Sequence, residues 1–241
     1  MSSKMNLCVI PARGGSKRIP RKNIKHFLGK PIIGYSIEAA LKSGCFDKVI
    51  VSTDDAEIAE IAKSFGAQVP FIRPEELAND FAGTIPVIKH AIEWLEERGD
   101  KFDSVCALYA TAPFVQACNL QESYKQLKKS YADYCFTVTP FASPIQRAVK
   151  INENNRIEMF YPENFNVRSQ DLEEAYHDAG QFYWGEPEAF KQEKLFFSDS
   201  ATPYVLPRYL VQDLDTQDDW IRAELMYQVL AKMDLNSCML S

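Results

Sequence analysis

MNLCVIPARGGSKRIPRKNIK, residues 5–25, joins an apolar run to a basic loop, and this junction guides the interpretation of the fold. The run from residue 5 to residue 12 predicts a buried strand. Residues 10–25 hold two adjacent glycines, a serine and six Lys or Arg side chains. In doubly wound sheets, ligands bind beyond the carboxyl ends of the strands, so this loop is where we first expect one.

Strand and helix patterns alternate along the first part of the chain. Apolar runs predict further strands at 46–53, 67–74, 102–113 and 133–141, and helical spacing predicts helices at 31–44, 54–66, 83–99 and 116–132. Strands joined by single helices need crossover connections, so we expect an α/β fold with a doubly wound, mostly parallel sheet. The later segments predict a hairpin at 147–162, a strand at 175–185, a short helix at 186–196, an extended stretch at 201–216 and a last helix at 217–233.

Length and composition limit the class of protein. The 241 residues suit one domain over residues 1–241, with a β-rich insertion at about 140–178. A net charge of −6 argues against a nucleic-acid partner, and no apolar run is long enough to cross a membrane. The short N-terminal apolar run is unlike a signal peptide, which predicts a cytoplasmic protein. The six cysteines form no C-x-x-C pair and are expected to be free thiols, and no histidine pattern predicts zinc.

The basic loop has the components of an anion site. Glycines at positions 14 and 15 let backbone N–H groups approach a ligand, and Ser16 adds a hydroxyl donor. The cations Arg13, Lys17, Arg18, Arg21 and Lys22 supply charge-assisted contacts to phosphate oxygens. The loop matches neither the G-x-x-x-x-G-K-[ST] phosphate loop nor the G-x-G-x-x-G dinucleotide motif. A solvated basic loop without a ligand is the alternative.

Carboxylates near the end of the chain form a second candidate site. Asp213 and Asp215 stand two residues apart in an extended segment, so both project to one side and suit Mg²⁺. Alternatively, Asp215 or Thr216 caps the last helix, and both interpretations can hold together. In the segment 52–55, STDD, the acidic residues fit the first turn of a helix better than a ligand contact. The aromatic residues 182–184 are expected in the core.

These segments, in this order, resemble the CMP-sugar synthetases, the cytidylyltransferases that activate acidic nine-carbon or eight-carbon sugars. The resemblance covers nearly the whole chain and rests on IPARGGSKRIPRKNIK at 10–25, RPEELANDFAGT at 73–84, LYATAPF at 108–114 and DLDTQDDW at 213–220. NVRSQDLEEAYHDAGQFYWG at 166–185 most resembles the branch that acts on pseudaminic acid. Tyr109, where the sialic-acid enzymes usually carry glutamine, favours the same branch.

The resemblance implies a fold of the nucleotide-diphospho-sugar transferase type and a reaction. The anomeric hydroxyl of an acidic nine-carbon sugar attacks the α-phosphate of CTP and releases pyrophosphate, with Mg²⁺ as cofactor. The implied catalytic residues are Arg13, Lys22, Asp213 and Asp215, of which Asp213 and Asp215 bind the metal. The implied nucleotide-binding residues are Ala12, Arg13, Gly14, Gly15, Ser16, Lys17, Lys22, Asn23, Arg73 and Thr84. The implied sugar-binding residues are Tyr109, Arg168, Gln170, His177 and Gln181.

The resemblance also implies a homodimer whose contact includes the segment at about 140–178. Synthetases for sialic acid, legionaminic acid or the eight-carbon octulosonate stay open as alternatives. Two other classes are a nucleotide-binding module without catalysis and a dinucleotide-dependent oxidoreductase. The first is disfavoured by the presence of Asp213 and Asp215, and the second by the missing G-x-G-x-x-G motif.

Overall fold

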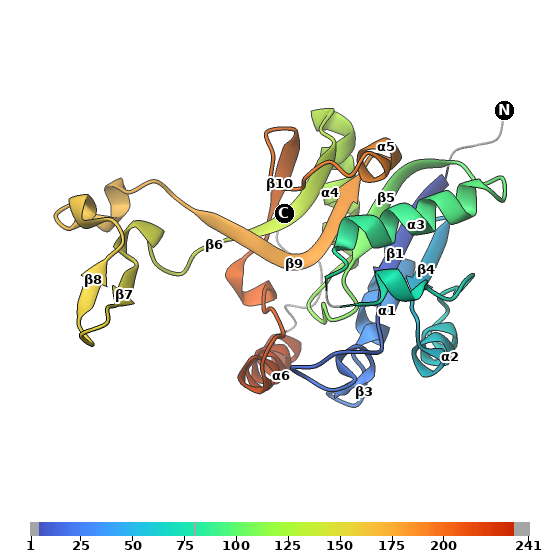
Figure 1. The fold of residues 1–241 in the computed structure, drawn as a ribbon, viewed down its shortest axis with the longest axis horizontal. Coiled ribbons are helices and arrows are strands. Elements are labelled where there is room, and N and C mark those ends of the chain that lie inside the picture. The colour runs from blue at the N-terminus through green and yellow to red at the C-terminus, as the bar shows by residue number, and fades with distance from the viewer. Residues whose placement is uncertain (1–4, 80, 234–241) are drawn as a thin grey trace.

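A six-stranded sheet forms the centre of the protein in a computed structural model, which describes residues 5–79 and 81–233. Its strand order is β10-β6-β9-β5-β1-β4 (Figure 1). These strands are β1 (Met5–Pro11), β4 (Lys48–Ser52), β5 (Phe102–Leu108), β6 (Tyr134–Pro140), β9 (Tyr176–Gly185) and β10 (Ala201–Val205). The pairs β1–β4, β1–β5 and β10–β6 are parallel, so the expected α/β sheet is confirmed.

The strand β9 is the exception to the parallel pattern. It lies between β5 and β6 and runs antiparallel to both. It also continues along β6 as far as the pair Pro140–Tyr176, beyond the end of its pairing with β5. As a result, β5 and β6 are not neighbours, although they follow one another in the first part of the chain.

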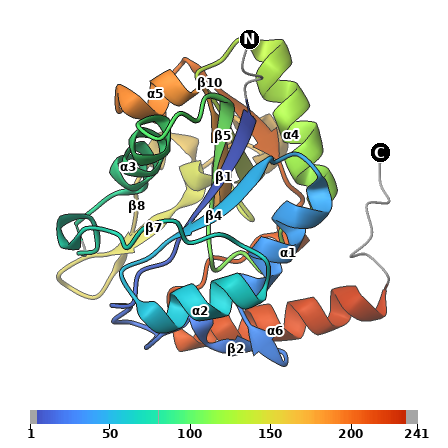
Figure 2. The same ribbon diagram turned by 90° about the vertical axis from the view of Figure 1, so that its right-hand side faces the viewer.

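Helices cover both faces of the sheet, as Figure 2 shows edge-on. The helices α1 (Ile33–Ser43), α2 (Ala56–Ser64) and α4 (Ala117–Ser130) share one apolar cluster, and α3 (Thr84–Glu96) and α5 (Pro187–Lys191) share the other. Strand β1 serves both clusters, because Cys8 and Ile10 face one and Leu7 and Val9 face the other. This burial on both sides explains why its sequence is a continuous apolar run.

A third apolar cluster attaches the C-terminal helix α6 (Gln217–Lys232). Phe27 and Trp220 meet edge to face there, with ring centroids 5.7 Å apart. Phe27 belongs to a small antiparallel pair, β2 (His26–Phe27) with β3 (Lys30–Pro31), which follows the basic loop and the 3-10 turn η1 (Lys22–Ile24). The cluster therefore brings α6 and the segment before it next to the basic loop.

An arm projects from the body of the molecule between β6 and β9 (Figure 1). It carries the antiparallel pair β7 (Val149–Ile151) and β8 (Ile157–Met159), the hairpin that the sequence predicts. The short turns η3 (Ile145–Arg147), η4 (Pro162–Asn164) and η5 (Ser169–Asp171) complete it. Several of its large apolar side chains are exposed, among them Val149, Ile151, Ile157, Phe160 and Phe165.

Two expectations need correction. The segment 67–74 forms only single bridges, Ile50 with Gln68 and Thr53 with Ile72, and is followed by the turn η2 (Glu75–Leu77). Cys8, Cys45, Cys106 and Cys135 are free thiols, whereas Cys118 is disulfide-bonded, and Cys238 lies outside the described residues.

The expectation about the aromatic residues 182–184 is met. Phe182, Tyr183 and Trp184 are buried in the core, as expected. Across residues 5–79 and 81–233, no helix has the length and apolar character needed to cross a membrane.

Candidate functional site

A pocket of about 220 Å³ opens beyond the carboxyl ends of β1 and β5. Three segments line it: the basic loop, the start of α3 with Arg73, and the residues that follow β5. Seven of the predicted nucleotide-binding residues line this pocket, together with Tyr109, and they are Arg13, Ser16, Lys17, Lys22, Asn23, Arg73 and Thr84. Ala12, Gly14 and Gly15 belong to the same loop but do not line the pocket.

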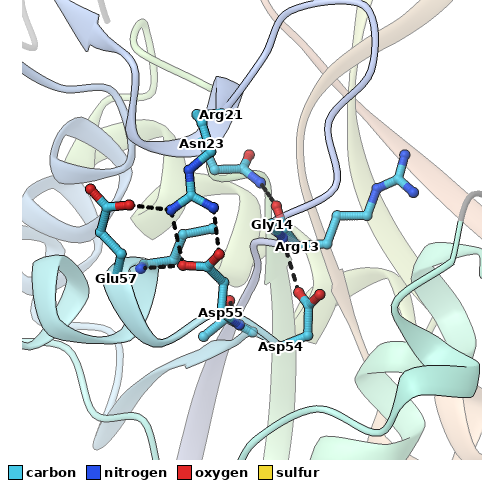
Figure 3. A network of polar contacts seen from close by, with 9 residues as sticks. Arg13, Gly14, Arg21, Asn23, Asp54, Asp55 and Glu57 are labelled. Carbon is cyan, nitrogen blue, oxygen red and sulfur yellow. Dashed lines mark hydrogen bonds and ion pairs between the residues drawn. The ribbon is translucent and has the colours of Figure 1, made fainter.

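The first part of the basic loop is fastened to its neighbours by hydrogen bonds. Asn23 donates through Nδ2 to the carbonyl oxygen of Arg13 over 2.8 Å, and the N–H of Gly14 donates to Asp54 Oδ1 over 2.9 Å (Figure 3). The N–H of Ala12 donates to the carbonyl of Ser52 over 2.9 Å. Asn23 thus supports the loop backbone from inside as well as lining the pocket.

Arg21 departs from the expectation that it binds an anion in the pocket. Its guanidinium forms ion pairs with Asp55 and Glu57, and it does not line the pocket (Figure 3). In the same figure, the Arg13 side chain points away from this group. The basic loop therefore divides its charge between the pocket and the N-terminus of α2.

Arg73 is a buried cation in the pocket wall, with only 4% of its surface exposed. Its Nε donates to Ser52 Oγ over 3.0 Å, and its N–H donates to the carbonyl of Thr53 over 2.8 Å. Burial lowers the pKa of Arg73 to about 10, and the nearby Arg13 charge acts in the same direction. A ligand that places hydrogen-bond acceptors against Arg73 would offset part of this cost.

The opposite wall contains a tyrosine that a second tyrosine supports. The Tyr109 hydroxyl lies 3.1 Å from Thr84 Oγ1, and its ring centroid is 5.4 Å from that of Tyr183. Tyr183 is buried and donates its hydroxyl proton to Asp178. Burial, followed by the charges of Tyr109 and Asp178, raises the pKa of Tyr183, which keeps it protonated as a donor.

Gln181 lies directly behind this wall. Its backbone carbonyl accepts from the N–H of Tyr109 over 2.8 Å, and its side-chain Nε2 donates to the carbonyl of Leu210. Gln181 is buried, and its Oε1 has no hydrogen-bond partner among the described residues. The residue thus connects the end of β5 to the segment that leads to α6.

Residues 213–216 adjoin the basic loop from the other side. Lys22 donates through Nζ to the carbonyl of Leu214 over 2.8 Å, and Asp215 pairs with Arg18 at 2.8 Å and with Lys22 at 3.7 Å. Thr216 caps α6 in a capping box with Asp219, so the capping interpretation is confirmed for Thr216. Asp213 and Asp215 do not themselves line the pocket, but Asp215 touches two side chains that do.

The donor set at this segment suits a hard cation that arrives with a phosphate ligand. Burial, followed by the charge of Asp215, raises the pKa of Asp213, and a bound cation would offset both effects. In the part of the chain that the structure describes, no group of three or more His, Cys, Asp or Glu side chains could enclose a metal ion. Mg²⁺ is commonly held by one or two carboxylates together with substrate phosphates, and the two aspartates fit that arrangement.

Three predicted sugar-binding residues lie away from the pocket. Arg168 and Gln170 belong to the arm and are exposed, and Arg168 pairs with Asp171 through bonds of 2.6 and 3.1 Å. His177 is exposed on β9 and packs its ring against Phe141, with centroids 4.9 Å apart. None of the three lines the pocket of the same chain.

Sequence reasoning missed the supporting role of Ser52–Asp55 and of Asp178 with Tyr183. STDD does not line the pocket, yet each of its four residues holds a pocket element, either Arg73 or the basic loop. Its position at the carboxyl end of β4, next to β1, was a usable signal, because neighbouring parallel strands end at the same edge.

The fold and this site define an α/β protein with a basic pocket at the carboxyl edge of its sheet. The chain belongs to the cytidylyltransferase family, whose model, described as "Cytidylyltransferase", matches residues 7–212. A pseudaminic acid cytidylyltransferase of Campylobacter jejuni serotype O:2 is 49% identical over 93% of this chain and 97% of that protein.

More distant relatives carry other sugar names. A CMP-N,N'-diacetyllegionaminic acid synthase of Legionella pneumophila is 32% identical over 92% of this chain and 96% of that protein. A solved structure of CMP:2-keto-3-deoxy-manno-octonic acid synthetase complexed with CTP covers 95% of this chain and 100% of its own, with a TM-score of 0.69 and 19% identity. At that identity the likeness bears on the fold alone.

Proposed function

We propose that this protein transfers CMP from CTP to pseudaminic acid, giving CMP-pseudaminic acid and pyrophosphate. The observation that carries the proposal is the 49% identity to the Campylobacter enzyme over 97% of that enzyme's length. The legionaminic acid relative is less similar, at 32%. The basic pocket beyond β1 supports the same conclusion from chemistry, because a triphosphate needs several cations and backbone donors together.

The pocket residues take roles that follow from their positions. Arg13, Ser16, Lys17 and Lys22, with the Gly14–Gly15 backbone, hold the triphosphate, and Asn23 keeps the loop in shape. Arg73, Thr84 and the backbone near Ala12 contact the cytidine part. The sugar hydroxyl forms a bond to the α-phosphorus as the bond to the pyrophosphate oxygen breaks, and the hydroxyl proton passes to solvent water. Lys22 and Arg13 stabilise the negative charge of this transition state.

Asp213 and Asp215 would hold Mg²⁺ beside the triphosphate. Bound there, the ion neutralises charge on the leaving pyrophosphate. Asp215 already adjoins Lys22 and Arg18, so its carboxylate lies at the border between the loop and the C-terminal segment. These two carboxylates also make the non-catalytic alternative the weaker one.

The sugar binds on the Tyr109 side of the pocket in this proposal. Gln181 fixes the backbone of Tyr109, and the partner in a homodimer supplies Arg168, Gln170 and His177. The exposed apolar side chains of the arm support a second copy as its partner, since isolated soluble proteins rarely expose so many together. Because CTP is a cytoplasmic metabolite, we place the reaction in the cytoplasm.

A substrate comparison tests the proposed function. Purified protein, CTP and Mg²⁺ are incubated with pseudaminic, legionaminic, sialic or octulosonic acid, and pyrophosphate release and the CMP-sugar are measured. We expect kcat/KM for pseudaminic acid to exceed the others by about a hundredfold or more, as for a site built around particular polar substituents. Preference for another sugar would overturn the substrate, and CTP binding without turnover of any sugar would overturn the activity.

A further inference from the structure

Two consecutive residues of the basic loop point to different parts of the molecule. Lys22 reaches the carbonyl of Leu214 and lines the pocket, whereas Arg21 reaches Asp55 and Glu57 at the start of α2 (Figure 3). At Arg21 the loop thus leaves the pocket and contacts the rest of the protein. Its side chain attaches the loop to α2 and does not line the pocket.

The ion pairs of Arg21 fix the orientation of its guanidinium group. Its two terminal nitrogens contact the two carboxylate oxygens of Asp55, the second over 3.0 Å, which makes a two-pronged pair. The same guanidinium also contacts Glu57 in the first turn of α2. Asp55 is itself fixed, because it caps α2 by accepting from the N–H of Ile58 over 3.0 Å. The loop is therefore tied to a rigid helix end.

The backbone of Arg21 points to the same role. Its φ of 55° and ψ of 32° lie in the left-handed region, which glycine adopts at lower cost than arginine. A residue with a long side chain at such a position offsets that cost through its side-chain contacts, here the pairs with Asp55 and Glu57.

The middle of the loop, residues 15–20, runs between two attached ends. Its own contacts include the bond of 3.1 Å from the Ser16 N–H to the Gly14 carbonyl, the pair of Arg18 with Asp215, and the burial of Ile19. Ser16 and Lys17 lie in this stretch and line the pocket. Their positions thus also depend on how firmly the ends are held, at one end by Asp54 and Asn23 and at the other by Asp55.

We propose that Arg21 and Asp55 form a positioning pair that holds the basic loop in its triphosphate-binding shape without touching the ligand. The inference rests on the proposed CTP-dependent activity. In this proposal Arg21 increases the affinity for CTP indirectly, by holding the loop that carries the ligand-binding residues. The STDD segment supports the pocket without lining it. The sugar side of the pocket, where Gln181 supports Tyr109 from behind, is left unchanged.

The variants Asp55→Asn, Arg21→Gly and Arg21→Lys test the pair. Asparagine keeps the helix cap, and glycine relieves the left-handed backbone, so both changes spare the fold. We expect the Kd for CTP, measured by calorimetry, and the KM for CTP to rise about fivefold in Asp55→Asn and Arg21→Gly, with Arg21→Lys between them and the wild type. The KM for the sugar and the melting temperature should stay unchanged.

Glu60→Gln is the matched control, because it removes an acid from the same helix whose ion pair, with Lys63, lies at the surface. Trypsin supplies a readout that needs no ligand: cleavage after Lys17 and Arg18 should be faster in Asp55→Asn than in Glu60→Gln or the wild type. An unchanged Kd for CTP would overturn the pair, as would a parallel rise of both KM values with a lower melting temperature.

The two proposals fail in different ways. If the wild type neither binds CTP nor turns over any sugar, the proposed function is wrong, and the trypsin comparison alone then judges the positioning pair. If the wild type is active and the variants behave like it, the pair is wrong and the function stands.

Discussion

Gly14 shows how the absence of a side chain can govern the site. A Cβ at this position would lie 2.7 Å from Asp55 Oδ2, well inside normal contact distance. The Gly14 N–H also donates to Asp54, so the backbone cannot retreat without losing that bond. Glycine is required here because the loop passes close to STDD, whereas a Cβ on the neighbouring Gly15 would meet nothing within 4 Å.

The substitution Gly14→Ala should therefore destabilise the protein, and Gly15→Ala should not. We expect the free energy of unfolding to fall by about 1–3 kcal/mol in Gly14→Ala, as for an overpacked position. The cause is displacement of the Asp55 carboxylate, which both caps α2 and pairs with Arg21. Urea titration of the two variants measures the difference. Equal unfolding midpoints would show that the loop moves aside freely.

At the residue scale, the sequence predicted the side chains that line the pocket better than the residues that hold the basic loop in place. The pocket lining contains Arg13, Lys17 and Lys22 where an anion loop was predicted from composition and position after a strand. The direction of Arg21 was not predictable, because it depends on a left-handed backbone turn and on acids at the start of another helix. Local charge alone does not say which cations face a ligand.

Among the elements, the segment before α6 combines two roles within four residues. Asp215 pairs with Lys22 of the basic loop, and Thr216 begins the helix through its capping box. The sequence allowed either role, and the structure supports capping directly through the bond from the Asp219 N–H to Thr216 Oγ1 of 3.2 Å. Strand β9 shows a similar limit of the sequence. Its apolar run predicted a strand, but its position between β5 and β6 depends on tertiary pairing, which the local sequence does not specify.

Variants of this segment should separate catalysis from stability. We expect Asp215→Asn to lower kcat by about a hundredfold, since a proposed ligand of the Mg²⁺ that would offset the transition-state charge is lost, with an unchanged melting temperature. Thr216→Ala should instead lower the free energy of unfolding by about 1 kcal/mol through loss of the cap. Turnover at increasing Mg²⁺ and thermal unfolding are measured on both. Full activity of Asp215→Asn would remove the metal assignment.

On the scale of the whole molecule, the arm is an addition to the central sheet and the helices that cover it. It leaves the body between β6 and β9 (Figure 1). Ile151 and Ile157 are paired across its two strands and are 68% and 69% exposed. The sequence predicted the hairpin, with its turn around Asn154 and Asn155. It did not predict the distance of Arg168 and His177 from the pocket, because that depends on the direction in which the arm projects.

The last prediction concerns assembly through the arm. The double variant Ile151→Lys with Ile157→Lys should convert a dimer into a monomer, because two charges would lose their hydration in an apolar interface. Light scattering after size exclusion measures the mass. Glu158→Gln is the control, since Glu158 pairs with Lys150 on the same ribbon and its removal leaves the apolar pair intact. We expect the monomer to keep its affinity for CTP, whose proposed pocket lies within one chain, and to lose turnover of the sugar, because we propose that its remaining contacts come from the partner. A monomeric wild type with full turnover would contradict both the dimer and the shared sugar site.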